Sequence, residues 1–318
     1  MIDVAALGEL LIDFTYEKAD TQGYPTMTAH PGGAPANFLA ALAKCGAKTA
    51  LIGKVGADAF GRLLRETLRN VGVDTRGLRT DEECFTTLAF VTLDADGNRE
   101  FSFARKPGAD TRLTAEEIDY SLIDEAKVFH FGTLSLTDEP ARTATQKAVA
   151  YAKGRGKLLS CDPNLRLPLW RSAEEAKKQL LWALAQADVV KISDDEATFL
   201  LGCSPAEGAE RIVRDFGAKL VFVTCGPDGC YFKNARACGQ VPAPKGLRII
   251  DTTGAGDIFG GSAMHKLLES GIPPEALDET RLREIAAFAC AAASLSATRS
   301  GGLSSAPSPE EVLPLLNA

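Results

Sequence analysis

The chain has 318 residues, of which 45% are hydrophobic and 24% charged, and its formal net charge is −7. The composition is ordinary for a globular protein, and the length suits one large α/β domain or two smaller ones. The acidic balance, together with the lack of a long Lys/Arg run, argues against nucleic acid and anionic membranes as partners.

The first residues, MIDVAALGELLIDF, are typical of a strand and not of a signal peptide, because a basic region and a cleavage site are missing. No apolar run reaches the roughly 18 residues that a membrane span needs. The eight cysteines are scattered and form no CxxC pair, so we interpret them as reduced thiols. We therefore expect a cytoplasmic protein.

In chain order, short apolar runs alternate with longer segments of helical periodicity. Strands are expected over residues 4–13, 49–56, 128–132, 158–164, 189–193 and 220–226. Helices are expected over residues 34–47, 58–73, 141–156, 173–187 and 195–202. This alternation predicts an α/β fold with a mainly parallel sheet that helices cover on both faces.

Two segments depart from this alternation. Residues 85–105 alternate with period two around Asp96-Gly97-Asn98, which predicts a β-hairpin. A second extended stretch lies at residues 14–30. We expect one α/β domain over residues 1–318, with a small β lid formed by insertions at about 14–30 and 85–106.

The stretch DTTGAGDIFGG, residues 251–261, predicts a strand end, a glycine turn and the start of a helix. The N–H groups at a helix start bind anions, and glycines let a phosphate approach the backbone. Asp257 would repel a resting phosphate, but it suits a general base that takes the proton of an attacking hydroxyl. The alternative is that Asp257 only complements the helix dipole.

Two other nucleotide-binding patterns do not fit the sequence. The dinucleotide fingerprint requires glycine at the position of Phe259, and the pattern GxxxxGK[ST] does not occur. A nucleotide would therefore be bound in another way.

Polar side chains also follow other predicted strands. Asp13 ends the first strand, and Asn37 lies in the first turn of the helix that follows two glycines. Further polar clusters follow the strands at 158–164, 189–193 and 220–226. Each cluster alone has a structural interpretation as a turn or a helix cap. Together, at the carboxyl ends of neighbouring strands, they predict a cleft for a nucleotide and a polyol.

Two segments, PGGAPANFLAALAKCGAKTALIGKVG and DTTGAGDIFGGSAM, resemble in order both signatures of the ribokinase-like (PfkB) carbohydrate kinases. The resemblance covers essentially the whole chain. FARKPGADTRL, CDPNLRLPLW and KISDDEATFLLG make it most similar to the bacterial fructokinase branch. The resemblance implies a three-layer ribokinase-like fold with a β-sheet lid. It also implies ATP-dependent phosphorylation of a sugar's primary hydroxyl, with D-fructose the leading substrate.

The resemblance implies roles for matched positions. Asp257 would be the catalytic base and touch the sugar, and the anion hole would comprise Gly254, Ala255 and Gly256. The sugar would further be held by Asp13, Gly32, Gly33, Asn37, Arg105 and Arg166. ATP would be bordered by Lys191, Ser193, Thr224, Gly226, Gly229 and Gly256. Glu196 would organise Mg²⁺ through water, whereas Ser193 stands where many relatives have Asn, which weakens a metal or phosphate role there.

The resemblance also implies K⁺ as an activator, beside the anion hole. Its site would comprise Asp251, Thr253, Ser296, Arg299, Gly301 and Ser305. In relatives the lid closes the sugar site and often forms a homodimer, and we expect both here. Alternative activities are 2-keto-3-deoxygluconate kinase, aminoimidazole riboside kinase and ribokinase. An alternative from a different class is a regulator that binds a sugar or nucleoside without catalysing a reaction. The missing dinucleotide fingerprint argues against a further class, the nicotinamide oxidoreductases.

Overall fold

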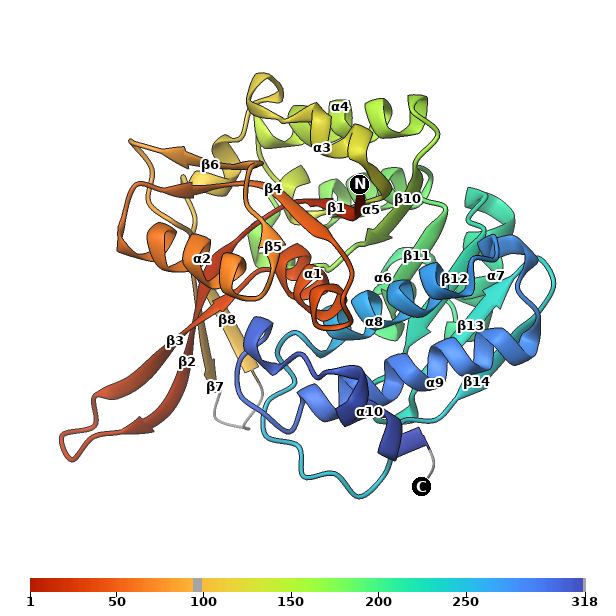
Figure 1. The fold of residues 1–318 in the computed structure, drawn as a ribbon. Helices are drawn as coiled ribbons and strands as arrows, with labels where there is room; N and C mark the ends of the chain where they lie inside the picture. The colour runs from red at the N-terminus through yellow and green to blue at the C-terminus, as the bar shows by residue number, and fades with distance from the viewer. Residues whose placement is uncertain (94–98, 317–318) are drawn as a thin grey trace.

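A ten-stranded, mostly parallel sheet forms the centre of the molecule (Figure 1). The computed structural model describes residues 1–93 and 99–316. The sheet has the order β14-β13-β12-β11-β10-β9-β1-β4-β5, and β6 also pairs with β4. Its strands are β1 (Ile2–Leu7), β4 (Thr49–Gly56), β5 (Val73–Asp74), β6 (Leu78–Asp81), β9 (Ala126–Gly132), β10 (Leu158–Asp162), β11 (Val189–Ser193), β12 (Leu220–Thr224), β13 (Cys230–Asn234) and β14 (Cys238–Val241). Among these described strands, only β13 runs opposite to the others, since it pairs antiparallel with both β12 and β14.

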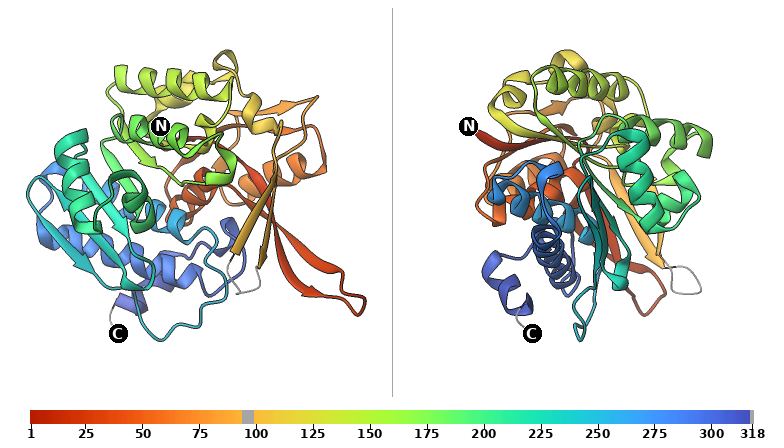
Figure 2. Two further views of the ribbon diagram at one scale, coloured as in Figure 1. Left: turned by 180° about the vertical axis from the view of Figure 1, so that it is seen from behind. Right: turned by 90° about the vertical axis from the view of Figure 1, so that its right-hand side faces the viewer.

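Helices cover both faces of this sheet, as the two further views show (Figure 2). One face carries α3 (Tyr120–Glu125), α4 (Ala141–Gly154), α5 (Ala173–Leu184), α6 (Asp194–Leu201) and α7 (Pro205–Phe216). The other face carries α1 (Ala34–Lys44), α2 (Ala59–Asn70), α8 (Ala255–Ser270) and α9 (Glu279–Ser296), and α10 (Pro309–Leu316) packs against α9. The predicted three-layer α/β fold is therefore confirmed.

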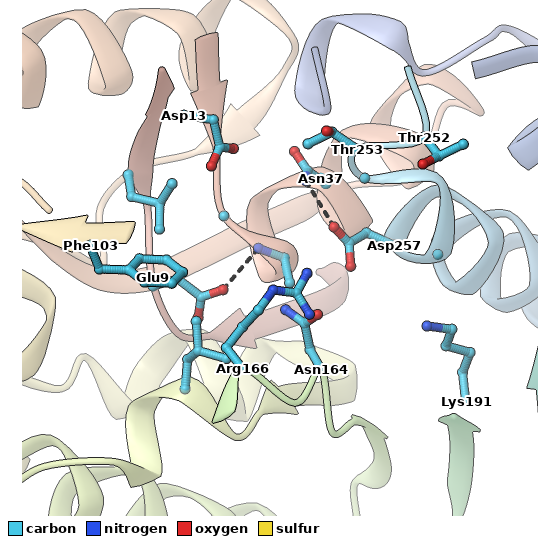
Figure 3. A pocket seen from close by; sticks show the side chains of 16 residues that line it. Glu9, Asp13, Asn37, Phe103, Asn164, Arg166, Lys191, Thr252, Thr253 and Asp257 are labelled. Carbon is cyan, nitrogen blue, oxygen red and sulfur yellow. Dashed lines mark hydrogen bonds between the residues drawn. The ribbon is translucent and has the colours of Figure 1, made fainter. Parts of the chain in front are cut away.

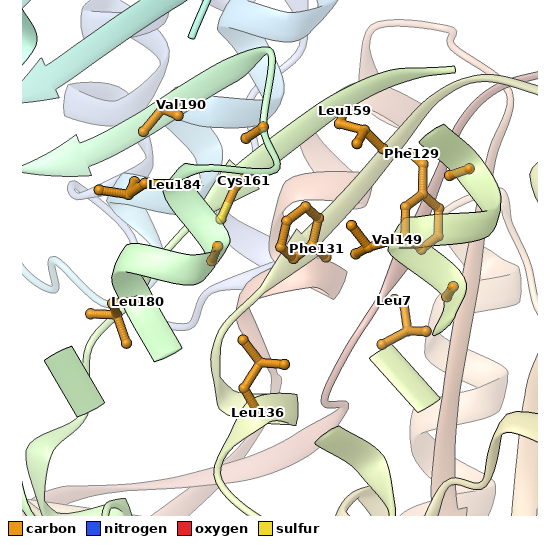
Figure 4. Packing of buried hydrophobic residues seen from close by; sticks show 14 of the residues in the cluster. Leu7, Phe129, Phe131, Leu136, Val149, Leu159, Cys161, Leu180, Leu184 and Val190 are labelled. Carbon is orange, nitrogen blue, oxygen red and sulfur yellow. The ribbon is translucent and has the colours of Figure 1, made fainter. Parts of the chain in front are cut away.

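Strand β9 shows why the sheet lies in the middle layer. Its side chains alternate between two apolar cores, so Phe129 and Phe131 enter the core beneath α4 and α5, whereas Val128 enters the opposite one. Figure 4 shows Phe131 packed near Leu136 and Val149. Burying each such side chain contributes about 1.5–3 kcal/mol, so a strand that is apolar on both faces is stable only between two helical layers.

A separate four-stranded sheet, which we call the lid sheet, projects from the main body (Figure 1). It has the order β3-β2-β7-β8 and consists of β2 (Leu11–Ala19), β3 (Pro25–Gly32), β7 (Leu88–Leu93) and β8 (Arg99–Ala104). The predicted hairpin and its companion stretch are thus confirmed as one sheet, in which β2 and β7 run parallel. Phe14 stacks on Phe90 at 5.4 Å across that seam. The predicted turn at Asp96-Gly97-Asn98 lies outside the described residues.

The prediction of a single first strand over residues 4–13 is wrong. The chain leaves the main sheet after Leu7, and β2 of the lid sheet begins at Leu11. The break has a structural cause, because Glu9 between the two strands turns its carboxylate to the backbone N–H of Ala34 at the start of α1. Asp13 therefore lies within β2 and not at the end of β1.

Helices α3, α7, α9 and α10 and strands β13 and β14 were not predicted from the pattern of the sequence. Helix α7 has standard start and stop residues, with Ser204 capping its first turn and Gly217 ending it. In the part of the chain that the structure describes, no helix combines the length and the apolar character needed to cross a membrane.

Candidate active site

A cavity of about 280 Å³ lies between the lid sheet, the carboxyl ends of the central strands and the start of α8 (Figure 3). The elements that line it come from distant parts of the sequence, as the topology of parallel sheets predicts. The lining residues are Glu9, Leu11, Asp13, Gly33, Ala34, Asn37, Phe103, Leu134, Asn164, Arg166, Lys191, Thr252, Thr253, Gly254, Gly256 and Asp257.

The start of α8 forms one end of the cavity. Gly254 precedes the helix with φ 76°, a left-handed conformation in which an added Cβ would lie 2.8 Å from the Cα of Gly302. Only glycine fits this turn without strain. The first amides of a helix lack an acceptor within the helix, so the amides after Gly254 suit an anion beside Asp257, although that of Ala255 also donates to the carbonyl of Thr252 at 3.2 Å. We call this segment the anion-binding turn. The predicted turn and helix are therefore present, but the predicted strand end is wrong, because residues 242–254 carry no strand.

Asp257 faces the cavity from the first turn of α8 (Figure 3). The side-chain amide of Asn37, in α1, donates a hydrogen bond to Oδ2 of Asp257 at 2.8 Å. Desolvation by the surrounding protein raises the pKa of Asp257 to about 6, against the opposing effects of Lys191, Asn37 and Arg166. The carboxylate is thus oriented by one partner and is a stronger proton acceptor than an exposed aspartate.

Lys191 brings a positive charge to the anion-binding turn. Its Nζ forms an ion pair with Asp162 at 3.0 Å, and an added Cβ on Gly256 would lie 2.8 Å from the same atom. Burial alone would lower the pKa of Lys191, but the carboxylates around it outweigh burial and raise that pKa. The ammonium group therefore stays charged at the place where an anion would bind.

Acidic side chains gather at the other end of the cavity. Burial raises the pKa of Asp13 to about 6, although nearby Arg166 lowers it, and burial raises the pKa of Glu9 to about 7. Arg166 and Asn164 reach into the cavity from the loop after β10 (Figure 3). Carboxylate, amide and guanidinium groups around a small cavity suit the hydroxyl groups of a sugar, because each hydroxyl both donates and accepts.

The sequence pattern of the pfkB family of carbohydrate kinases matches residues 1–309. The chain belongs to this family. Fructokinase-2 of Solanum lycopersicum is 43% identical to this kinase over 316 residues, which cover 98% of this chain and 95% of the relative.

Two solved structures are similar to this kinase along its length. The fructokinase of Xylella fastidiosa, with bound ATP, has a TM-score of 0.90 at 30% identity and matches 99% of this chain and 98% of its own. The fructokinase of Vibrio cholerae, with bound fructose, ADP and calcium, has a TM-score of 0.85 at 31% identity and matches 99% of both chains. The likeness thus extends to the lid as well as to the central sheet.

Two of the predicted ATP and metal positions of this kinase serve as a helix cap. The Ser193 hydroxyl accepts the backbone N–H of Glu196, and the Glu196 carboxylate accepts the backbone N–H of Ser193 at 2.9 Å. Glu196 also accepts the N–H of Leu165 at 2.6 Å. This capping box satisfies two amides at the start of α6. Burial raises the pKa of the neighbouring Asp162, an effect that Lys191 opposes and that the charge of Glu196 reinforces.

The other predicted ATP positions lie beside the cavity and not in its lining. Thr224 ends β12, and Gly226 and Gly229 belong to the short turn that joins β12 to the antiparallel β13. Strand β12 neighbours β11, which carries Lys191. These residues therefore border the same edge of the sheet, and their contact with ATP stays a prediction.

Arg105 lies beside the cavity, where it lines a neighbouring hollow together with Phe103, and its predicted contact with sugar or phosphate stays a prediction. It is 3% exposed and lies outside the cavity lining. Its three nitrogens already donate within the protein, to Asp110, Thr137 and the carbonyl of Leu134. Gly32 is likewise absent from the lining, but it is packed against Asp13, since an added Cβ would lie 2.0 Å from Oδ2 of Asp13.

The predicted cation residues come from two segments that lie together. Asp251 accepts the N–H of Thr253 at 2.9 Å and that of Gly301 at 3.1 Å. Ser296 and Ser305 donate their hydroxyls to the carbonyls of Ala293 and Gly302, and Arg299 pairs with Glu311. Among the described residues, no group of three or more His, Cys, Asp or Glu side chains could hold a metal.

Sequence reasoning missed Glu9, Phe103, Leu134 and Thr252 as lining residues. Glu9 had a recognisable feature, since an acidic residue between apolar neighbours is unusual in a buried strand. No feature of the sequence marked the apolar Phe103 and Leu134 as lining residues, because their position in the cavity depends on how the lid sheet meets the main domain.

Proposed function

We propose that this kinase is a fructokinase, which transfers the γ-phosphoryl group of ATP to the primary hydroxyl of D-fructose. The observation that carries the proposal is the position of Asp257, which stands at an anion-binding helix start and faces a small polar cavity. The two similar fructokinase structures described above, one with bound ATP and one with bound fructose and ADP, support the choice of both substrates.

Each wall of the cavity has a role in this reaction. Asp257 accepts the proton of the attacking hydroxyl, while Asn37 holds the carboxylate in place. The amides at Gly254, Ala255 and Gly256, with Lys191, stabilise the charge on the transferred phosphoryl group. Asp13, Gly33, Asn37 and Arg166 bind the sugar hydroxyls. Positioning and electrostatics account for most of the catalysis, because phosphoryl transfer needs little covalent help from the protein.

A divalent metal would accompany ATP, as expected for phosphoryl transfer. Mg²⁺ is usually held by one or two carboxylates together with the substrate's phosphates. The carboxylates near the anion-binding turn fit this need, since Oδ1 of Asp162 is buried without a hydrogen-bond partner among the described residues. Such a metal would supply positive charge that offsets the charge of the phosphates, and Glu196 would hold it through water.

We also propose that K⁺ activates the enzyme. The proposed site lies where Asp251, Thr253 and Gly301 meet, beside the anion-binding turn. A cation there would stabilise the loop that precedes α8 without touching the sugar. The remaining proposed residues, Ser296, Arg299 and Ser305, belong to the segment that packs against Asp251.

The molecule is proposed to work as one ribokinase-like domain with the lid sheet closing over the sugar. Closure excludes water and so limits wasteful hydrolysis of ATP. Two copies would pair through their lids, a proposal that exposed Tyr16 and Tyr24 on the lid support.

The test is ADP release from Mg²⁺–ATP, with and without K⁺, across fructose, ribose, 2-keto-3-deoxygluconate, aminoimidazole riboside and glucose. Turnover on fructose at a kcat/KM far above the other sugars is the expected result. A higher kcat/KM for another sugar of the panel would change the assigned substrate but not the assigned reaction. Sugar binding without ADP release would overturn the kinase proposal in favour of a silent binding protein.

A further inference from the structure

The second arm of the lid, strands β7 and β8, joins the main domain at a buried polar cluster. Strand β7 begins directly after Thr87, and β8 ends directly before Arg105. The Thr87 hydroxyl donates to Oδ1 of Asp110, and Nε of Arg105 donates to Oδ2 of the same carboxylate at 2.8 Å. Both ends of this arm therefore converge on one side chain.

Asp110 belongs to the main domain. It lies in the short 3₁₀ turn η1 (Ala109–Arg112), which packs against β4 of the central sheet. Thr87, Arg105 and Asp110 are 1%, 3% and 6% exposed, so water does not compete for these hydrogen bonds. We call Thr87, Arg105, Asp110 and Thr137 the lid anchor.

The same arginine also holds the opposite wall of the cavity. Its terminal nitrogens donate to Oγ1 of Thr137 at 2.7 Å and to the carbonyl of Leu134 at 2.9 Å. Leu134 lines the cavity from the main domain, and Phe103, two residues before Arg105, lines it from the lid. One guanidinium group thus fixes the lid wall and the main-domain wall relative to each other.

The anchor is suited to fixing geometry more than to adding stability. A buried ion pair often stabilises a fold no better than apolar residues of the same volume. A guanidinium group, however, presents its donors in one rigid plane, so it fixes both distance and direction. The anchor also has no spare room, because an added Cβ on Gly108 would lie 2.0 Å from Oγ1 of Thr87 and 2.9 Å from Oδ1 of Asp110.

We propose that Asp110 is a positioning residue for sugar phosphorylation. Through Thr87 and Arg105, Asp110 sets the distance between Phe103 and Leu134. That distance in turn determines the affinity for sugar and the exclusion of water. The inference rests on the proposed function. Asp110 acts through the lid, since neither Asp110 nor Arg105 lines the cavity.

Steady-state kinetics of Asp110→Asn and Gly108→Ala test the proposal by two routes, since the second variant keeps every charge. We expect the KM for fructose to rise about tenfold or more in both, because charge-assisted hydrogen bonds are lost or displaced. The KM for ATP should stay within about twofold, and the ratio of ATP hydrolysed to sugar phosphorylated should rise. An unchanged fructose KM in both variants would overturn the proposal.

Asp188→Asn is the matched control for loss of a carboxylate. Asp188 pairs with Lys219 at 3.1 Å just before β11, at the sheet edge opposite the cavity. The Asp188→Asn variant should lower the unfolding temperature without changing the KM for fructose. A fructose KM that rises equally in this control would show a general effect of destabilisation and refute the assigned role.

The double variant Arg105→Met/Asp110→Leu separates positioning from stability. It removes both buried charges together, so stability should recover relative to Asp110→Asn. The fructose KM should stay raised, because the directional contacts remain absent. Recovery of the KM together with stability would mean that Asp110 only supports the fold.

Hydrogen exchange gives a readout that does not depend on activity. Without ligands, Asp110→Asn should speed amide exchange in residues 88–93, 99–104 and 134–137 and leave β9 to β12 unchanged. If the wild-type enzyme phosphorylates no sugar but this exchange pattern appears, the proposed function fails while the anchor stands. Uniform exchange changes, or none, would refute the anchor.

Discussion

The two walls of the cavity are stabilised in different ways. Asp257 stands on α8, which packs against both α1 and α9 and buries Ile258, Phe259 and Met264 in the apolar core. The facing wall is the lid sheet, whose strand β2 is buried from Leu11 to Asp13 but exposed from Glu17 onward. The proposed base thus lies on a helix held along its length, whereas the sheet proposed to enclose the sugar is held at its base. Changes on the helix side should therefore act on kcat, and changes on the lid side on the KM for sugar.

Replacing the proposed base should give the largest effect. Asp257→Asn keeps the shape but cannot accept a proton, so kcat should fall by roughly 10²–10⁴-fold, the usual contribution of general-base catalysis. Single-turnover kinetics and ATP binding measure the two consequences, and ATP affinity should change little. Glu279→Gln, in the first turn of α9, is the matched control and should leave kcat intact. Near wild-type turnover of Asp257→Asn would refute the assignment.

Removing the partner of the base should have a smaller effect on the same wall. Asn37→Ala deletes the hydrogen bond to Asp257, and kcat should fall about tenfold to a hundredfold, since such bonds to charged groups contribute roughly 1.5–3 kcal/mol. The bond favours the ionised carboxylate, so its loss should also move the acid limb of the pH–rate profile upward.

Asn234→Ala is the control for this variant. Asn234 is fully buried and donates to the carbonyls of Pro274 and Leu277, away from the cavity. The Asn234→Ala variant should destabilise the fold without moving the acid limb of the pH–rate profile. The role of Asn37 would be contradicted if both variants moved the limb equally.

The pH dependence should reflect both walls at once. Asp257 must be ionised to accept a proton, and its pKa of about 6 lies above that of an exposed aspartate. As pH falls through 6 the carboxyl takes up a proton, so kcat/KM should fall. Asp13, on the lid side, also has a pKa of about 6, and the slope should therefore approach two decades per pH unit. Asp13→Asn should reduce that slope to one decade per pH unit. An unchanged slope would show that ionisation of Asp13 does not contribute to catalysis.

The smallest effect on turnover is expected at the far end of the lid. Tyr24 is 66% exposed near the tip of the β2–β3 hairpin. Tyr24→Asp should shift a lid-mediated dimer toward monomers in sedimentation experiments while kcat changes by no more than about twofold. If the wild-type protein sediments as a monomer at every concentration, the proposal of a lid dimer is wrong.

Local sequence patterns were sufficient to predict the glycine turn and the helix that carries the proposed base. The glycine turn, Asp257 and the helix are consecutive residues, so their arrangement follows from backbone geometry that a motif records. The closeness of Asp162, at the end of β10, to Lys191 in the neighbouring β11 was also predictable, because parallel strands place their carboxyl ends at one edge.

The lid wall could not be predicted to the same degree. The matched position of Arg105 implied a sugar contact, yet its contacts depend on Asp110, Leu134 and Thr137, which no motif links to it. Asp13 was assigned to the main sheet because the run from Val4 up to Asp13 is apolar except at Gly8 and Glu9, and these two residues alone do not show that the chain changes sheets there. These outcomes depend on tertiary contacts that composition and periodicity do not carry.

The parallel seam of the lid has a consequence for how the chain folds. Ile12 pairs with Leu88, and Phe14 stacks on Phe90, although α1, β4 and α2 lie between them in the sequence. Such a long-range pairing must close a large loop before it gains any contact, so it forms slowly. The seam can assemble only after the intervening part of the main domain has brought its two ends together. We expect the ability to enclose sugar to be acquired late in folding, after the central sheet has formed.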